Sequence, residues 1–348
     1  MKILFFFPKL EKAKQHHYMP ISALAVSAEL LAQGHEVISI RHDDAPVDTA
    51  KLLGISDRIT WAKGSILDER FCRRVVADYG IDTIFHLAAL PLTQVATRTI
   101  APIFQTNLMG TVHLLEAVKE NAWAGKNIRF VYISTDKSYG SVGNKPYTED
   151  MPLNGLAPYD CSKACADLAT QTYAASGFAP SVVIVRPCNI IAPGDLNLGR
   201  ILPRMIFPCL RGENPTLYKT EYLREFIAVE DAVKAIYLLD DALRRDHSSF
   251  HGQAFNIGSG NQRSLEQVVN VVLAHFPSLQ TNWIEAPPVA RVEIPFQLLS
   301  TKKIQYALGW RAEISFETAV ENLIHWWKAN WEKLPDGLKG RQIKTWHG

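Results

Sequence analysis

Apolar positions along the chain form short continuous runs that alternate with stretches of helical period. Runs such as 83–89 and 129–134 are rich in β-branched and aromatic residues, which is typical of buried strands. Stretches such as 69–80 and 102–122 instead repeat apolar residues at helical spacing, which predicts amphipathic helices. The predicted strands are 2–7, 35–40, 58–64, 83–89, 129–134 and 181–187, and the predicted helices between them are 20–33, 69–80, 102–122 and 159–176.

This alternation of strands and helices predicts the fold. Repeated β-α-β units form a parallel sheet with helices on both faces, so we expect an α/β, doubly wound, Rossmann-like domain. Ligands of such sheets bind beyond the carboxyl ends of the strands. Polar residues that directly follow a strand are therefore the first candidates for a site.

The pattern changes beyond Asn189, because proline and glycine interrupt the apolar runs of 190–215. Helical patterns return at 231–245 and 264–276 and in an aromatic-rich stretch near the end. We predict a smaller C-terminal substrate-binding lobe built from two segments. The predicted division is 1–189 plus 229–254 for the dinucleotide-binding domain and 190–228 plus 255–348 for the substrate lobe.

Composition narrows the class of protein. The 348 residues are 47% apolar and 21% charged, as in an ordinary globular enzyme. A net charge of +2 gives no electrostatic reason to expect nucleic acid or an anionic membrane as partner. The five cysteines are an odd number without metal-ligand spacing, and no signal peptide or membrane span is recognisable. We therefore expect a cytoplasmic protein.

The stretch from Ser134 to Lys163 carries the chemistry. Tyr159 and Lys163 are four residues apart on a predicted helix, so they lie on one face. An ammonium beside a phenol lowers the pKa of the phenol, which makes Tyr159 a candidate general base for a substrate alcohol. The plainer interpretation is an amphipathic helix with a solvated lysine.

Ser134 ends the strand predicted at 129–134, and Thr135, Asp136 and Lys137 directly follow it. An acid and an amine side by side at a strand end suit proton transfer to and from a substrate. A lysine base would also need burial to favour its neutral form. The alternative is a local ion pair that caps the strand end.

Seven motifs in order resemble the extended short-chain dehydrogenases/reductases of the nucleotide-sugar epimerase/dehydratase family. They are His86-Leu87-Ala88-Ala89, Thr106-Asn107-x-x-Gly110-Thr111, Ser134-Thr135-Asp136-Lys137, Tyr159-x-x-x-Lys163, Arg186-Pro187-x-Asn189, Arg224-x-Phe226-x-x-Val229-x-Asp231 and Leu308-Gly309-Trp310. The segments HLAALPL and PGDLNLGRILP are most similar to CDP-glucose 4,6-dehydratases and their relatives.

The resemblance implies an NAD- or NADP-dependent enzyme acting on a nucleotide-diphosphate sugar. Tyr159 would take the proton of the sugar 4-hydroxyl, with Lys163 and Thr135 assisting. The resulting 4-ketone makes the C5 proton acidic, so Lys137 as base and Asp136 as acid would remove water across C5 and C6. Hydride return to C6 would give a 4-keto-6-deoxy sugar.

The same resemblance implies two sets of binding residues. The expected cofactor-binding residues are Arg41, Ser65, Ile66, Ala88, Ala89, Ser134, Tyr159, Lys163 and Pro187. The expected substrate-binding residues are Asn189, Arg200, Arg224 and Arg291; arginine suits bidentate phosphate contacts.

The first strand-to-helix connection departs from the family pattern. Members place a glycine-rich turn there, whereas the first glycine of this chain is Gly34, after the first predicted helix. Lysines and His16-His17 in segment 8–20 could replace the backbone amides as a pyrophosphate cradle, with Arg41 then favouring NADP. Alternatively the segment serves another ligand, or the cofactor is held only from the catalytic side. No third ligand accompanies the histidine pair, so no metal is expected.

Two classes of function remain open at this point. The first is a 4,6-dehydratase (a lyase), with a 4-epimerase (an isomerase) or reductase of the same family as the enzymatic alternative; Asp136-Lys137 favours the dehydratase. The second is a non-catalytic binding protein on the same fold. The resemblance also implies a homodimer that pairs the helix around 101–121 and the Tyr159 helix with their copies.

Overall fold

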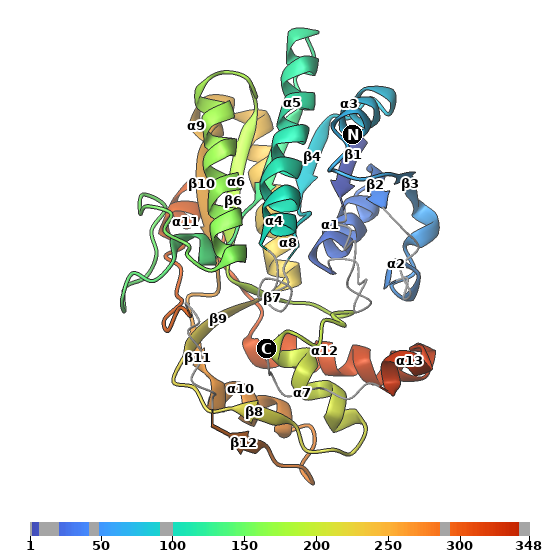
Figure 1. The fold of residues 1–348 in the computed structure, drawn as a ribbon, viewed down its shortest axis with the longest axis vertical. Helices are drawn as coiled ribbons and strands as arrows, with labels where there is room; N and C mark the ends of the chain where they lie inside the picture. Colours follow the sequence, from blue (N-terminus) through green and yellow to red (C-terminus); the bar gives the residue numbers. More distant parts are fainter. Residues whose placement is uncertain (1, 7–20, 42–48, 91–99, 286–292, 341–348) are drawn as a thin grey trace.

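Seven parallel strands form the main sheet, in the order β10-β6-β5-β4-β1-β2-β3 (Figure 1). The computed structural model describes residues 2–6, 21–41, 49–90, 100–285 and 293–340. The strands are β1 (Lys2–Phe6), β2 (Glu36–Arg41), β3 (Ile59–Lys63), β4 (Thr83–His86), β5 (Arg129–Ile133), β6 (Val182–Pro187) and β10 (Gln253–Ile257). The order reverses between β1 and β4, which is where ligands of doubly wound sheets bind.

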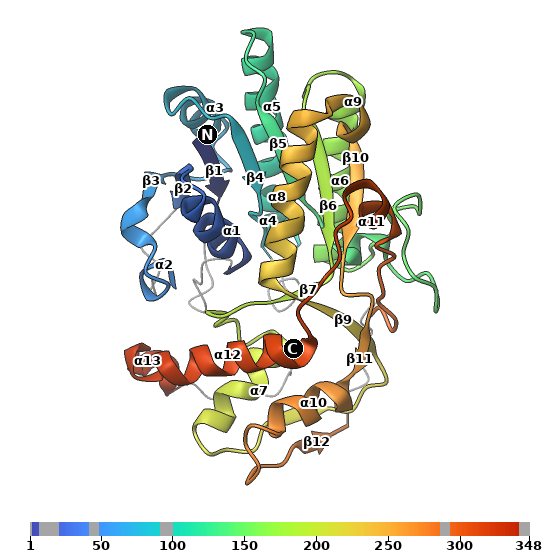
Figure 2. The ribbon, with the colours of Figure 1, turned by 180° about the vertical axis from the view of Figure 1, so that it is seen from behind.

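Helices cover both faces of this sheet. The face seen in Figure 1 carries α3 (Glu69–Asp78), α5 (Gly110–Trp123) and α6 (Pro158–Ala175), and the face seen in Figure 2 carries α1 (Ile21–Ala32) and α8 (Val229–Arg245). Because side chains alternate along a strand, Phe130 and Tyr132 pack under α5 and α6, while Val131 and Ile133 join the core with α1 and α8. Both faces of each central strand are therefore buried, which explains the continuous apolar runs.

Below the main sheet lies a smaller lobe with two small sheets (Figure 1). The first has the order β11-β9-β7, with β7 (Asn189–Ile191), β9 (Leu223–Ala228) and β11 (Gln262–Ser264); the second pairs β8 (Thr216–Tyr218) with β12 (Asn282–Ile284). Its main helices are α7 (Ile201–Leu210), α10 (Leu265–Leu273) and α12 (Phe316–Asn330). Trp327 on α12 is fully buried in the core of this lobe, as expected of a packing residue.

The remaining helices are short. They are α2 (Thr49–Leu52), α4 (Ala101–Phe104), α9 (His247–Phe250), α11 (Lys302–Leu308) and α13 (Asp336–Lys339), with 3₁₀ turns at Ser56–Arg58, Asp136–Tyr139 and Trp331–Lys333. No helix in the described part of the chain is long and apolar enough to span a membrane.

The observed order of strands and helices confirms the predicted α/β, doubly wound fold. The predicted division into two segments per domain stays a prediction; β10, which pairs with β6 in the main sheet, crosses the boundary placed at residue 254. The helix predicted at 102–122 differs in one respect, because Gln105–Met109 forms a π-helical turn. There Asn107 accepts a hydrogen bond from the Leu90 amide at 2.7 Å and donates to Ser162 on α6 at 2.8 Å, and such turns often occur at functional sites.

Candidate active site

The site forms where β5 and β6 end and α6 begins. Thr135 follows β5 in extended conformation and its hydroxyl accepts a hydrogen bond from the Lys137 amide, which starts the 3₁₀ turn Asp136–Tyr139. Pro158 occupies the first turn of α6, a position that needs no amide donor. Tyr159 and Lys163 therefore project from the first two turns of a helix that starts at the carboxyl edge of the sheet.

Lys163 is buried under the end of β5, with 2% of its surface exposed. Its amine donates to the Ile133 carbonyl at 2.5 Å and lies 4.3 Å from the centroid of the Tyr132 ring. Burial lowers the pKa of Lys163 to about 7, against an opposing effect of Asp167. The group can therefore gain or lose a proton near neutrality, and an ammonium has three N–H donors for partners.

The Tyr159 phenol does not have the lowered pKa that its spacing from Lys163 predicts. Burial raises the pKa of Tyr159, the neighbouring Asp160 and Asp136 raise it further, and Arg200 is the cation that opposes them. Within the described residues no hydrogen bond joins Tyr159 to Lys163, because the Lys163 amine faces the β5 carbonyl. The prediction that Lys163 lowers the pKa is therefore wrong for this arrangement of the chain.

Asp136 and Lys137 lie together, as their adjacency predicts. Asp136 is 1% exposed, its Oδ1 accepts from the Thr135 hydroxyl at 3.0 Å, and the Lys137 amine is 3.7 Å away. Asp136 Oδ2 is also buried, and no described residue donates a hydrogen bond to it. The Lys137 side chain is 31% exposed and its amine donates to Asn189 Oδ1 at 3.1 Å. An acid and an amine thus lie together near Tyr159, on whose pKa the Asp136 charge acts.

Asp160 is a member of this cluster that the sequence reasoning missed. It is 7% exposed, and burial raises the pKa of its carboxyl to about 7, opposed by Lys137 and Arg224. Asp136 and Glu293 act in the same direction as burial. Asp160 stands inside the Tyr159-x-x-x-Lys163 motif itself, and its place next to the tyrosine was the signal that could have identified it.

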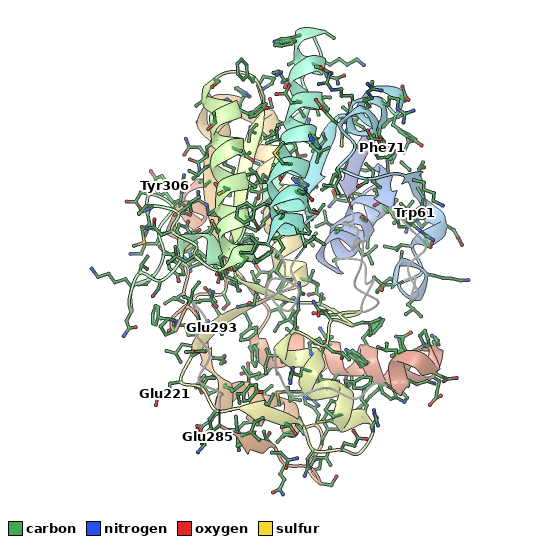
Figure 3. All side chains as sticks on the ribbon, in the orientation of Figure 1. Trp61, Phe71, Glu221, Glu285, Glu293 and Tyr306 are labelled. Atoms are coloured by element: carbon green, nitrogen blue, oxygen red, sulfur yellow. The ribbon has the colours of Figure 1, made fainter. Side chains whose placement is uncertain are left out.

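Two of the expected substrate arginines reach the same region from the smaller lobe. Arg224 on β9 lies 5.0 Å from the centroid of the Tyr222 ring and 3.5 Å from a carboxylate oxygen of Glu293, which Figure 3 labels beside β9. Arg200 precedes α7 and pairs with Asp195 at 3.1 Å. The charges of Arg224 and Arg200 act on Asp160 and Tyr159 respectively. Arg291 lies outside the described residues.

The expected cofactor-binding residues line the carboxyl edge of the main sheet. Arg41 ends β2, with its guanidinium 5.5 Å from the Trp61 ring centroid. Ser65 and Ile66 follow β3, and the Ile66 carbonyl lies 2.7 Å from His113 Nδ1 on α5. Further along the edge, Ala88 and Ala89 follow β4, Ser134 follows β5 and Pro187 ends β6. The proposed cradle at 8–20 lies outside the described residues.

The model of the NAD-dependent epimerase/dehydratase family matches residues 24–258 of this chain, which is more than half of its length. The chain belongs to this family. The predicted family and the class of NAD-dependent sugar-nucleotide enzymes are confirmed. Tyr159, Lys163 and the residues after β4, β5 and β6 lie at the carboxyl edge of the main sheet.

Curated relatives and solved structures agree with this assignment. The chain is 25% identical to dTDP-glucose 4,6-dehydratase 1 of Escherichia coli over 318 residues, covering 84% of each chain. It is also 25% identical to CDP-glucose 4,6-dehydratase of Salmonella typhimurium over 311 residues, covering 85% of this chain and 84% of the relative. The structure of the Streptomyces venezuelae dTDP-glucose 4,6-dehydratase with NAD superposes with a TM-score of 0.81 at 24% identity, covering 97% of this chain and all of that one.

Proposed function

We propose that this member of the family is an NAD-dependent nucleotide-sugar 4,6-dehydratase. The observation that carries the proposal is the Asp136-Lys137 pair beside Tyr159. Asp136 Oδ2 is buried and receives no hydrogen bond from the described residues. Because buried polar atoms are almost always hydrogen-bonded, this oxygen is suited to a substrate hydroxyl.

Each of the four side chains near the start of α6 and the end of β5 then has one role in the reaction. Tyr159 removes the proton of the sugar 4-hydroxyl. The Thr135 hydroxyl, which donates to Asp136 Oδ1 in the free protein, turns its proton to the O4 oxygen of the sugar. Lys137 takes the C5 proton once C4 is a ketone. Asp136 protonates the departing C6 hydroxyl, so that the C6–O bond breaks and water leaves.

The residues along the sheet edge fit a nicotinamide dinucleotide. Ala88 and Ala89 leave space after β4 because of their small side chains, and Lys163 has donors beyond the one given to Ile133. We assign these three residues and Ser134 to the nicotinamide side, with Lys163 holding the ribose. When bound, the nicotinamide supplies the redox chemistry by accepting hydride from C4 and returning it to C6. The similarity to NAD-containing dehydratase structures favours NAD over NADP.

The test begins with the cofactor. The purified protein is denatured with acid, any released dinucleotide is identified by mass spectrometry, and NAD and NADP are titrated. The protein is then incubated with NAD and a panel of nucleotide-hexoses. We expect a 4-keto-6-deoxy product that has lost one water, with no net change in the redox state of the cofactor.

Other outcomes would contradict the proposal in distinguishable ways. Inversion at C4 with the C6 hydroxyl retained would make the protein an epimerase. No dinucleotide binding and no turnover would leave a binding protein on this fold. The Tyr159→Phe variant is the matched control, because it keeps the aromatic ring and removes only the phenolic hydroxyl.

We also propose a homodimer through α5 and α6, and a cytoplasmic location. Met109 beside α5 and Leu168 on α6 are exposed large apolar residues, as are Trp123 at the end of α5 and Phe178 after α6. Sedimentation equilibrium tests the dimer, and a monomer at micromolar concentration would contradict it. All five cysteines are free, which suits a reducing compartment.

A further inference from the structure

We propose that Asn189 is a positioning residue for Lys137. The smaller lobe fixes the position of Asn189, and Asn189 in turn holds the Lys137 amine where it can remove a proton from the substrate. This inference rests on the proposed dehydratase function. The family resemblance assigns Asn189 to the substrate, whereas the structure gives both of its polar side-chain atoms a protein partner. Oδ1 accepts from the Lys137 amine at 3.1 Å, and Nδ2 donates to the Glu225 carbonyl at 2.9 Å.

The orientation of the Asn189 amide is determined by Glu225. A backbone carbonyl can only accept a hydrogen bond, so it must face the NH₂ group of Asn189 and leave Oδ1 toward Lys137. Asn189 on β7 is paired with Phe226 on β9, which places it beside that carbonyl. A reversed amide would set two oxygens against each other and the NH₂ group against the amine.

The Glu225 side chain is fixed by burial and by hydrogen bonds from backbone amides. Its carboxylate is fully buried and accepts from the amides of Gly260 at 2.6 Å and Leu299 at 2.7 Å. A side chain at Gly258 would come within 2.4 Å of this carboxylate, so the loop after β10 closes tightly over it. The Glu225 carbonyl is therefore a fixed point of the smaller lobe, and Asn189 connects it to Lys137.

The chemistry of an amide acceptor suits a lysine that must work as a base. An amine can donate to a neutral oxygen in either protonation state, and a neutral amine that does so keeps its lone pair free for the substrate. A carboxylate at position 189 would instead favour the ammonium form. The charged or titratable groups that face Lys137 are Asp136 in the same turn, Asp160 on α6 and Cys188 after β6.

The two half-reactions separate this role from direct substrate contact. With nicotinamide bound, C4 oxidation would leave it in its reduced form, and elimination followed by hydride return would restore the oxidised form. In Asn189→Ala we expect oxidation at near the wild-type rate and elimination slowed by about 10- to 100-fold, the range for losing a hydrogen bond to a charged group. Asn189→Asp should slow elimination at least as much. Ile190→Val, in the same strand, is the control and should leave both steps unchanged.

The experiment is single-turnover mixing of holoenzyme with nucleotide-hexose in deuterated water. Absorbance of the reduced nicotinamide follows oxidation, and mass spectrometry of the product follows deuterium exchange at C5. Accumulation of reduced cofactor with the KM unchanged supports the proposal. Equal slowing of both steps, or a raised KM alone, overturns it in favour of substrate contact.

Two further outcomes also decide against the proposal. Failure of both Asn189 variants to fold, judged by circular dichroism, would make the residue structural. A wild-type protein that oxidises but never eliminates, or does neither, would overturn the dehydratase function and this inference together. A wild-type dehydratase with unaffected Asn189 variants would overturn the inference alone.

Discussion

Two lysines near the end of β5 lie in opposite surroundings. Lys163 comes from α6, is almost completely buried and has a backbone carbonyl and an aromatic ring as neighbours. Lys137 comes from the turn after β5, is partly exposed and lies between Asp136 and Asn189. Burial lowers the pKa of Lys163 to about 7, against the opposing charge of Asp167, whereas Lys137 is held by a polar network.

The difference corresponds to the two halves of the proposed reaction. Lys163 lies on the same helix as Tyr159 and on the side where the nicotinamide is expected, so it belongs with oxidation. Lys137 lies with the buried Asp136 carboxyl, so it belongs with elimination. A single active site would thus contain two amines whose loss should stop the reaction at different stages.

The largest expected effect comes from removing the base that is proposed for the elimination step. Lys137→Met should reduce product formation by about 10²- to 10⁴-fold, the usual contribution of a general base, while oxidation continues and reduced nicotinamide accumulates. Tyr159→Phe should give a comparable loss without that accumulation, because the reaction stops before hydride leaves C4. Stopped-flow absorbance of the reduced cofactor distinguishes the two. Identical absorbance traces for both variants would contradict the assignment of Lys163 to oxidation and Lys137 to elimination.

A smaller effect is expected on stability, because burial of Lys163 should make the free energy of unfolding depend on pH. Its pKa falls from 10.5 to about 7 on folding, so between these values the unfolded state binds more protons than the folded state. This residue therefore makes the free energy of unfolding rise as the pH increases through that window, by about 1.4 kcal/mol for each unit of pKa shift. Lys163→Met should flatten the rise.

Urea unfolding at several pH values measures this contribution. Lys302→Met is the matched control, because that lysine is exposed and its replacement should leave the pH dependence as it is. A wild-type profile that is already flat between neutral and alkaline pH would contradict the deprotonation of Lys163 in the folded state.

The order of strands and helices and the two candidate catalytic pairs were predictable because they are local in sequence. Continuous apolar runs and helical periodicity predicted the order of strands and helices. Asp136-Lys137 lies within one turn, and Tyr159-x-x-x-Lys163 lies within the first turns of one helix. The direction of the Tyr159 pKa was not predictable. It depends on burial and on Arg200, which reaches the site from another lobe.

Other features escaped prediction because they join distant parts of the chain. Asn189 and Lys137 are 52 positions apart, and their hydrogen bond depends on the pairing of β7 with β9. The π-helical turn at Gln105–Met109 likewise depends on the contacts of Asn107 with Leu90 and Ser162. Helical periodicity carries no signal for either.

The smallest expected effect tests the influence of the Asp160 charge on the pKa of Tyr159. Asp160 is the charged group that most raises the pKa of Tyr159, and its own pKa is raised to about 7 by burial. Asp160→Asn removes this negative charge and should lower the pKa of Tyr159. Because the phenolate is the form that takes the substrate proton, the acid limb of the rate profile should move to lower pH.

A shift of less than one pH unit is expected, which corresponds to at most a tenfold higher rate, and it should be confined to pH values above about 7, where the Asp160 carboxyl is charged. The pH dependence of C4 oxidation in single turnovers measures it, with the exposed Asp78→Asn as control. A shift to higher pH would mean that Asp160 stabilises the reactive form through a contact with substrate instead. In that case the carboxyl would act with Lys137 on the sugar. Side chains from α6 would then take part in elimination as well as in oxidation, and the two steps would no longer be divided between α6 and the turn after β5.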